Sequence, residues 1–170
     1  TAGTNVLIPN TATIFPTIED AREVNKIKLE SGTSLTLTSA GQLTINNTYT
    51  NSGSNITNNG TWIMAGSAAS QTFPGTAATV GAMNNLEIKN ASGIAFDKSF
   101  SITGTLMPTT GNINVNNNIA VTLKSSATAT ASVAAIQPAA SINYTGSGSF
   151  IVERFINTGL AIGQHVKTWQ

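Results

Sequence analysis

The carboxylates of this chain are few, and most of them stand alone. They are Glu19, Asp20, Glu23, Glu30, Glu87, Asp97 and Glu153. Enzymes that cleave polysaccharides need clustered carboxylates, or a cation site with basic partners, on one surface. Glu19, Asp20, Arg22 and Glu23 form the one local cluster, and a charge run this short is usually a solvated turn. We interpret it as a solvated turn rather than a catalytic site.

The other charged residues predict no chemistry either. Asp97 and Lys98 follow an apolar segment directly, which is typical of an exposed turn. Glu87 and Lys89 alternate with apolar neighbours, so we expect them on an outer face in contact with water. His165 has no second histidine or carboxylate at metal-ligand spacing, and the chain has no cysteine. We therefore expect no enzymatic activity, no cofactor and no metal site.

Trp62 is the one candidate ligand contact. In an extended segment, Trp62 and Met64 share one face and Ile63 takes the other. If Ile63 points inward, Trp62 is exposed and can stack on a sugar ring, whereas the opposite orientation makes it a core residue. We favour the core.

Thr-x-Thr pairs also recur along the chain. Their irregular spacing is explained better by the β-propensity of threonine than by an ordered ice-binding array.

Composition excludes several classes of protein. The chain has 170 residues, a formal net charge of +1, 9% charged residues and 40% hydrophobic residues. Near neutrality with this much apolar content predicts a folded chain. The scattered cations do not form the basic surface that nucleic acids require, so we expect no nucleic-acid partner. Apolar runs are far shorter than the ~20 residues of a membrane-spanning helix, so we expect no membrane insertion.

Short segments with apolar residues two positions apart recur along the chain, for example Ile27 with Leu29 and Leu43 with Ile45. This alternation is typical of strands buried on one side, and no stretch keeps a helical period. The strands are separated by connectors of roughly three or four residues, which favours a coil of short strands. We predict an all-β parallel β-helix, a solenoid with about 20 to 24 residues per coil. An antiparallel β-sandwich is the alternative, although the tight-hairpin dipeptide Asn-Gly occurs only at Asn59.

The chain divides into three expected parts. Residues 1–23 contain Pro9 and Pro16, which suit an N-terminal cap or a leading edge strand. Residues 24–156 form the parallel β-helix. Residues 157–170 begin a linker or a further domain. Within the helix, the segment at Asn25 is similar to the one at Asn84, which predicts that Ile27 and Leu86 occupy equivalent positions in their coils.

Three segments resemble a known family. They are GSAASQTFPG at 66–75, NNLEIKNASGIAFDKSFSITGTLMPTTGNINV at 84–115 and GSGSFIVERFI at 146–156, the last followed by Trp169. These are similar to the repeat region of large surface proteins that Bacteroidetes export by the type IX secretion system. The sequence departs from that pattern at Phe155, where tyrosine is usual, and at Gln170, where arginine is usual. The resemblance implies a right-handed parallel β-helix, a location outside the cell or on its surface, and an adhesin-like role.

Together these observations predict a non-catalytic extracellular module, a β-helical stalk or adhesive surface of a secreted or cell-surface protein. Its expected partners are cell-surface glycans, other surface proteins and further domains of the same chain. Two alternatives stay open. One is a carbohydrate-binding or polysaccharide-degrading β-helix, and the other is a subunit of an extracellular filament whose coils stack end to end.

Overall fold

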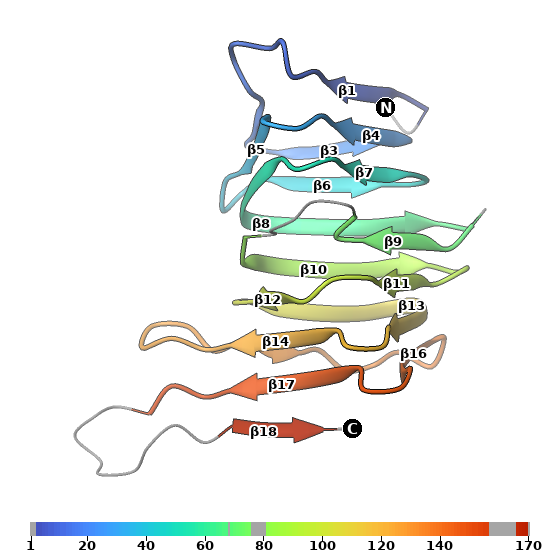
Figure 1. Cartoon of the computed structure of the whole chain (residues 1–170), viewed down its shortest axis with the longest axis vertical. Helices are drawn as coiled ribbons and strands as arrows, with labels where there is room; N and C mark the ends of the chain where they lie inside the picture. The colour runs from blue at the N-terminus through green and yellow to red at the C-terminus, as the bar shows by residue number, and fades with distance from the viewer. Residues whose placement is uncertain (1–2, 68, 76–80, 157–165, 170) are drawn as a thin grey trace.

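The fold is known from a computed structural model that describes residues 3–67, 69–75, 81–156 and 166–169 (Figure 1). Every regular element in these residues is a strand, and consecutive coils stack in parallel as a β-solenoid. The prediction of an all-β parallel β-helix is therefore confirmed. Among the described residues, antiparallel pairing joins only β17 (Ser149–Glu153) and β18 (Val166–Trp169), which rules out the β-sandwich.

The strands form three faces around a common interior, each named here after its first strand. The β1 face consists of β1 (Asn5–Ile8), β4 (Lys26–Leu29), β7 (Tyr49–Asn51), β9 (Gln71–Phe73), β11 (Ile94–Phe96), the second half of β13 (Thr105–Val115) and β16 (Ala140–Tyr144). The β2 face consists of β2 (Thr17–Ile18), β5 (Ser34–Leu37), the first part of β8 (Asn55–Gly66), β12 (Phe100–Ile102), β14 (Ala120–Lys124) and β17. The β3 face consists of β3 (Ala21–Val24), β6 (Gln42–Ile45), the second part of β8, β10 (Met83–Asn90), the first half of β13 and β15 (Ser132–Val133).

Coil length follows from the pairing of equivalent residues. Asn5 pairs with Lys26, and Ile27 pairs with Tyr49, so these coils have 21 and 22 residues. The range of 20 to 24 residues predicted from the sequence describes most of the stack. The largest departure is the coil between β13 and β16, where Gly111 pairs with Ala140, 29 residues later. The extra residues form loops on either side of the short strand β15.

The core is a set of inward-facing columns that run along the solenoid. On the β3 face, Leu43, Trp62, Leu86 and Leu106 occupy successive stacked positions, and all are buried. On the β1 face, Ile94 and Ile113 do the same. The alternation read from the sequence assigned the buried sides of these strands correctly. Each fully buried large apolar side chain contributes about 1.5 to 3 kcal/mol of hydrophobic free energy.

The tight corner between the β2 and β3 faces explains a recurrent glycine. A Cβ atom on Gly41 would overlap the carbonyl oxygen of Ile18, and one on Gly60 would overlap that of Gly41. Only glycine lets the backbones of successive coils stack this closely. Asp20 occupies the position of these glycines in the first coil. Its carbonyl accepts a hydrogen bond from the N–H of Gln42, just as the carbonyl of Gly41 accepts one from Thr61.

The segments at Asn25 and Asn84 are not equivalent, because Ile27 lies on the β1 face whereas Leu86 lies on the β3 face. That repeat prediction was wrong. The described part of residues 1–23 supplies β1, β2 and most of β3, which together form the first coil. In the C-terminal part 157–170, residues 157–165 and 170 lie outside the described residues, and the backbone of β18 pairs with the last coil.

Candidate functional site

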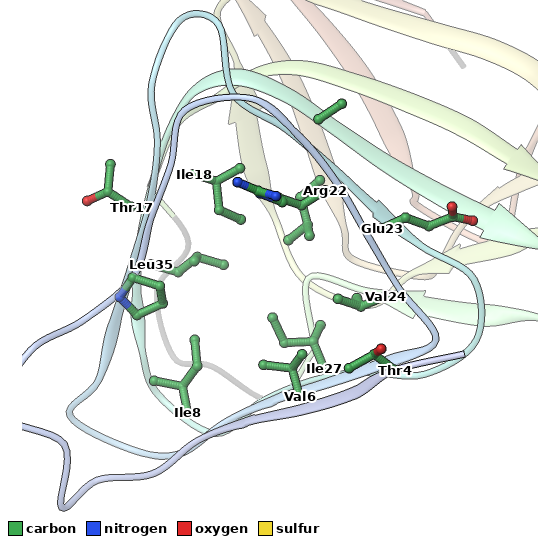
Figure 2. Close-up of a pocket in the computed structure, with 13 residues that line it drawn as sticks. Thr4, Val6, Ile8, Thr17, Ile18, Arg22, Glu23, Val24, Ile27 and Leu35 are labelled. Atoms are coloured by element: carbon green, nitrogen blue, oxygen red, sulfur yellow. The ribbon is translucent and has the colours of Figure 1, made fainter. Parts of the chain in front are cut away.

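A cavity lies at the first coil of the solenoid. Figure 2 looks at the interior of the first coil, where Val6, Ile8, Ile18 and Val24 point toward one another around a cavity of about 510 Å³. Ile27, Leu35 and Leu43 of the next coil also line it. In the rest of the stack the next coil fills the equivalent space. Within the described residues, the cavity therefore lies at the end of the hydrophobic core that the first coil forms.

Arg22 lies at the mouth of this cavity. It pairs with Leu43, so it holds the first position of the inward column that continues through Leu43 and Trp62. In Figure 2 its side chain lies across the opening, beside Ile18. Its Nε atom is 2.7 Å from Oδ1 of Asp20, and the two side chains are 64% and 60% exposed. The aliphatic part of Arg22 covers apolar surface while its guanidinium stays in water.

The acidic cluster near Arg22 is thus divided by the fold. Glu23 points away from the opening, and its Oε1 accepts a hydrogen bond from Nδ2 of Asn46 at 2.7 Å. Glu19 is exposed in the turn that precedes Asp20. All four side chains are exposed, as expected, but Arg22 and Glu23 belong to strand β3 rather than to a turn, and Arg22 lines an apolar cavity.

Trp62 lies inside the solenoid. Its side chain is fully buried, its ring contacts those of Tyr49 and Phe73, and its Nε1 donates to Sδ of Met64 at 3.2 Å. Ile63 takes the outward position between Thr44 and Glu87. The favoured interpretation of Trp62 as a core residue agrees with this position. The alternative surface contact with a sugar does not, because no ring face of Trp62 is exposed.

Asp97 is not the exposed turn that we expected. Its side chain is partly buried, its Oδ1 atom is buried without a hydrogen-bond partner, and desolvation raises the pKa of its carboxyl group. The hydroxyl of Tyr49 is also buried, and desolvation raises the pKa of Tyr49 strongly. The nearby side chain of Asn51 lowers the pKa of Tyr49, but desolvation is the larger effect. Tyr49 begins β7 and Asp97 follows β11, both on the β1 face, and each carries a buried polar atom.

Gln71 forms a second interior feature. On the β1 face, no backbone pairing joins β7 to β9 within the described residues. The Gln71 side chain partly replaces it: Nε2 donates to the carbonyls of Ile45 at 3.1 Å and Asn47 at 2.6 Å, and Oε1 accepts from Nδ2 of Asn90 at 2.8 Å. Buried amides satisfied in this way hold successive coils together. This network is structural, and it lies in the core.

The remaining candidates lie on the outside. Lys89 is exposed, and Glu87 accepts a hydrogen bond from Oγ1 of Thr109 at 2.9 Å, as expected for outer-face residues. A hollow of about 340 Å³ on the outside of the β2 face is lined by Ser101, Thr122 and Lys124 with their neighbours. His165 lies outside the described residues. Within the described ranges, no three metal-ligating side chains gather at one point, and no helix suited to crossing a membrane is found.

Comparison with known proteins adds no relative. No family model matches the sequence, no curated protein matches it, and no solved structure matches the fold. Function must therefore be argued from the geometry of the solenoid itself.

Proposed function

We propose that this chain is a non-catalytic structural module, a β-solenoid stalk or adhesive surface of a secreted or cell-surface protein. The observation that carries the proposal is the continuity of the stack. Parallel ladders run from the first coil to the last on the β2 and β3 faces, and the Gln71 side chain bridges the gap between β7 and β9 on the β1 face. Neighbouring coils therefore share hydrogen bonds as well as contacts in the apolar core. Such a rod holds whatever is attached to its two ends at a fixed distance.

The outer surface suits a module that works in water. Short uncharged side chains hydrogen-bond from one coil to the next, as Asn25 does to Asn5 at 3.0 Å and Ser141 to Asn112 at 2.8 Å. These contacts need no charge, which accounts for the low charge content of a chain with so much exposed surface. The resemblance of three segments to type IX exported surface proteins supports the same role and an extracellular location.

The hollow on the β2 face is the place where an adhesive role would reside. Ser101 and Thr122 supply hydroxyl groups, and Lys124 supplies a cation at the same rim. Hydroxyls with one cation suit an acidic glycan. The alternative of a polysaccharide-degrading module receives less support, because the Asp20–Arg22 pair and Asp97 lie on different parts of the solenoid.

The experiment is a comparison of binding and cleavage on the same polysaccharides. The purified chain is incubated with neutral and acidic glycans, and both bound protein and new reducing ends are measured. Lys124→Glu tests the hollow, and Lys89→Glu is a matched control with the same charge change on another face. We expect no new reducing ends. Binding of acidic glycans that is lost in Lys124→Glu alone would identify an adhesive module, and absence of binding would identify a spacer. New reducing ends that require this chain would refute the proposal.

A further inference from the structure

The sequence holds one Asn-Gly dipeptide, Asn59 followed by Gly60, and it lies within strand β8 rather than in a hairpin turn. In unstructured chains asparagine is most reactive before glycine, because glycine has no side chain to shield its nitrogen. That nitrogen attacks Cγ of the asparagine, the new N–C bond closes a succinimide ring, and ammonia leaves. Water then opens the ring to aspartate or isoaspartate. Asn59 is exposed, so its side chain is accessible to this reaction.

We propose that the corner between the β2 and β3 faces holds Gly60 so that Asn59 does not cyclise while the coils are stacked. Resistance to deamidation is a chemical property that goes beyond the structural role and does not rest on it. Strand β8 passes from one face to the other at these two residues. Its ladders therefore fix the backbone on both sides of the reactive dipeptide.

The glycine nitrogen has a partner of its own. The N–H of Gly60 donates to Oδ1 of Asn58 at 3.1 Å. Asn58 is buried, and its Nδ2 donates to the carbonyl of Asn85 at 3.3 Å. Ring closure requires the glycine nitrogen to lose its proton and to turn toward Cγ of Asn59. Both steps break the hydrogen bond to Asn58 and leave a buried amide oxygen without its donor, which is costly.

The surrounding backbone leaves Gly60 no room to turn. A Cβ atom on Gly60 would overlap the carbonyl oxygens of Gly41 and Thr38 in the preceding coil. On the other side, Nδ2 of Asn84 donates to the carbonyl of Asn59 at 2.7 Å. The peptide unit between Asn59 and Gly60 is thus held by the coil before it and by the coil after it. Rotation of this unit requires the coils to separate locally.

The product of the reaction would damage the stack. Isoaspartate carries the chain through its side-chain carbon and so adds one atom to the backbone. Asn58 pairs with Leu37 on one side of the dipeptide, and Thr61 pairs with Gln42 on the other. An extra backbone atom between them puts the two parts of β8 out of register with each other. Protection of Asn59 therefore preserves the coil to which it belongs.

The test compares deamidation in the folded and the unfolded chain. The chain is incubated at one mildly alkaline pH and one temperature, in buffer and in concentrated guanidinium chloride. Peptide mapping by mass spectrometry follows the conversion of Asn59 with time. Only molecules in which the corner is open react, so the ratio of the two rates measures how often it opens. We expect Asn59 to react at least about a hundredfold more slowly in the folded chain.

A matched control moves the dipeptide to an open turn. Ser31→Asn places an asparagine before Gly32, which is exposed and has open space around it. We expect the added site to react in the folded chain within about tenfold of its rate in denaturant, because exposed turns open readily. Asn59 stays protected in the same variant, so one sample reports on both sites.

Two further variants test the contacts that hold the corner. Asn58→Ala removes the acceptor of the Gly60 N–H, and we expect Asn59 to react at least about tenfold faster than in wild type. Because Asn58 is buried, circular dichroism checks that this variant folds. Asn84→Ala, at a partly exposed position, removes the contact from the following coil and is also expected to raise the rate.

Several results would overturn the proposal. Deamidation of Asn59 at the same rate in the folded and the unfolded chain would do so. Equal protection of the site added before Gly32 would do so as well, because protection would then come from folding in general and not from this corner. A rate that stays at the wild-type value in both Asn58→Ala and Asn84→Ala would show that these contacts do not hold Gly60.

Discussion

Arg22 stands one coil above Leu43 in the same inward-facing column. The alternation of β3 places Arg22 on the same side as Val24, which is buried. The first coil thus places a charged side chain at an inward-facing position, where more than half of that side chain is exposed. Its ion pair with Asp20 keeps the guanidinium in water, while the aliphatic part of Arg22 lines the apolar cavity of the first coil.

Replacement of Trp62 by alanine tests its assignment to the core. Trp62 is fully buried and contacts the rings of Tyr49 and Phe73, so the variant loses both hydrophobic free energy and packing. We expect Trp62→Ala to lower the free energy of unfolding by about 3 to 5 kcal/mol, measured by urea denaturation. Ile14→Ala, at an exposed position, is the control, with an expected change within about 0.5 kcal/mol. A variant as stable as wild type would place Trp62 outside the core.

The Gln71 network makes a second prediction. Gln71→Leu keeps a side chain of similar size but removes the amide that serves Ile45, Asn47 and Asn90. Because buried carbonyls lose their donors, we expect a loss of about 2 kcal/mol or more in the free energy of unfolding. The control is Gln137→Leu, whose exposed side chain contacts only the nearby carbonyl of Ala135. Equal stability of both variants would contradict a structural role for Gln71.

Two glycines separate backbone strain from close packing. Gly32 and Gly111 have positive φ angles of 81° and 86°, so alanine is strained at both. A Cβ atom on Gly32 meets open space, whereas one on Gly111 overlaps the carbonyl oxygen of Asn90 in the preceding coil. We expect Gly32→Ala to cost about 1 kcal/mol and Gly111→Ala considerably more. Thermal and urea unfolding of the pair measure this, and equal losses would show that the coils are not stacked as closely as described.

Asp97 predicts a pH dependence of stability. Desolvation raises the pKa of this carboxyl above its ordinary value of 3.8, so the folded chain holds a proton that the unfolded chain has released. The sign follows: the free energy of unfolding falls as the pH rises from the ordinary pKa through the raised one. Asp97→Asn keeps the shape without the charge. We expect it to be more stable than wild type at neutral pH and equally stable at pH values below 3.8. Urea unfolding across this range checks it, and a difference independent of pH would show that Asp97 does not ionise in a desolvated site.

Much of the fold could be predicted from the sequence, because a solenoid repeats one simple pattern. Pairs such as Ile27 with Leu29 identified buried sides, and short connectors favoured coils over hairpins. The failures have physical reasons. Ile27 and Leu86 were aligned because all three faces use the same alternation, so similarity between segments does not show which face each belongs to.

The candidate site was harder to predict. Arg22 was assigned to a solvated turn because charged residues normally face outward, although its spacing from Val24 implied an inward position. Gln71 has the same spacing from the buried Phe73, and its polar side chain gave no sign of an inward position. In both cases the side chain occupies the inward position that the alternation of the strand predicts, although its polarity suggested an outward one.

The most direct test of the structural role is to pull the solenoid along its axis. The chain has no cysteine, so Thr13→Cys and Thr145→Cys in one variant give unique handles near the two ends. A stack held by shared ladders is expected to resist force and then release coils in steps. Each step should lengthen the chain by about 70 Å, the span of an extended segment of about 20 residues. Extension at low force without steps would contradict the claim that this chain is a load-resisting structural module.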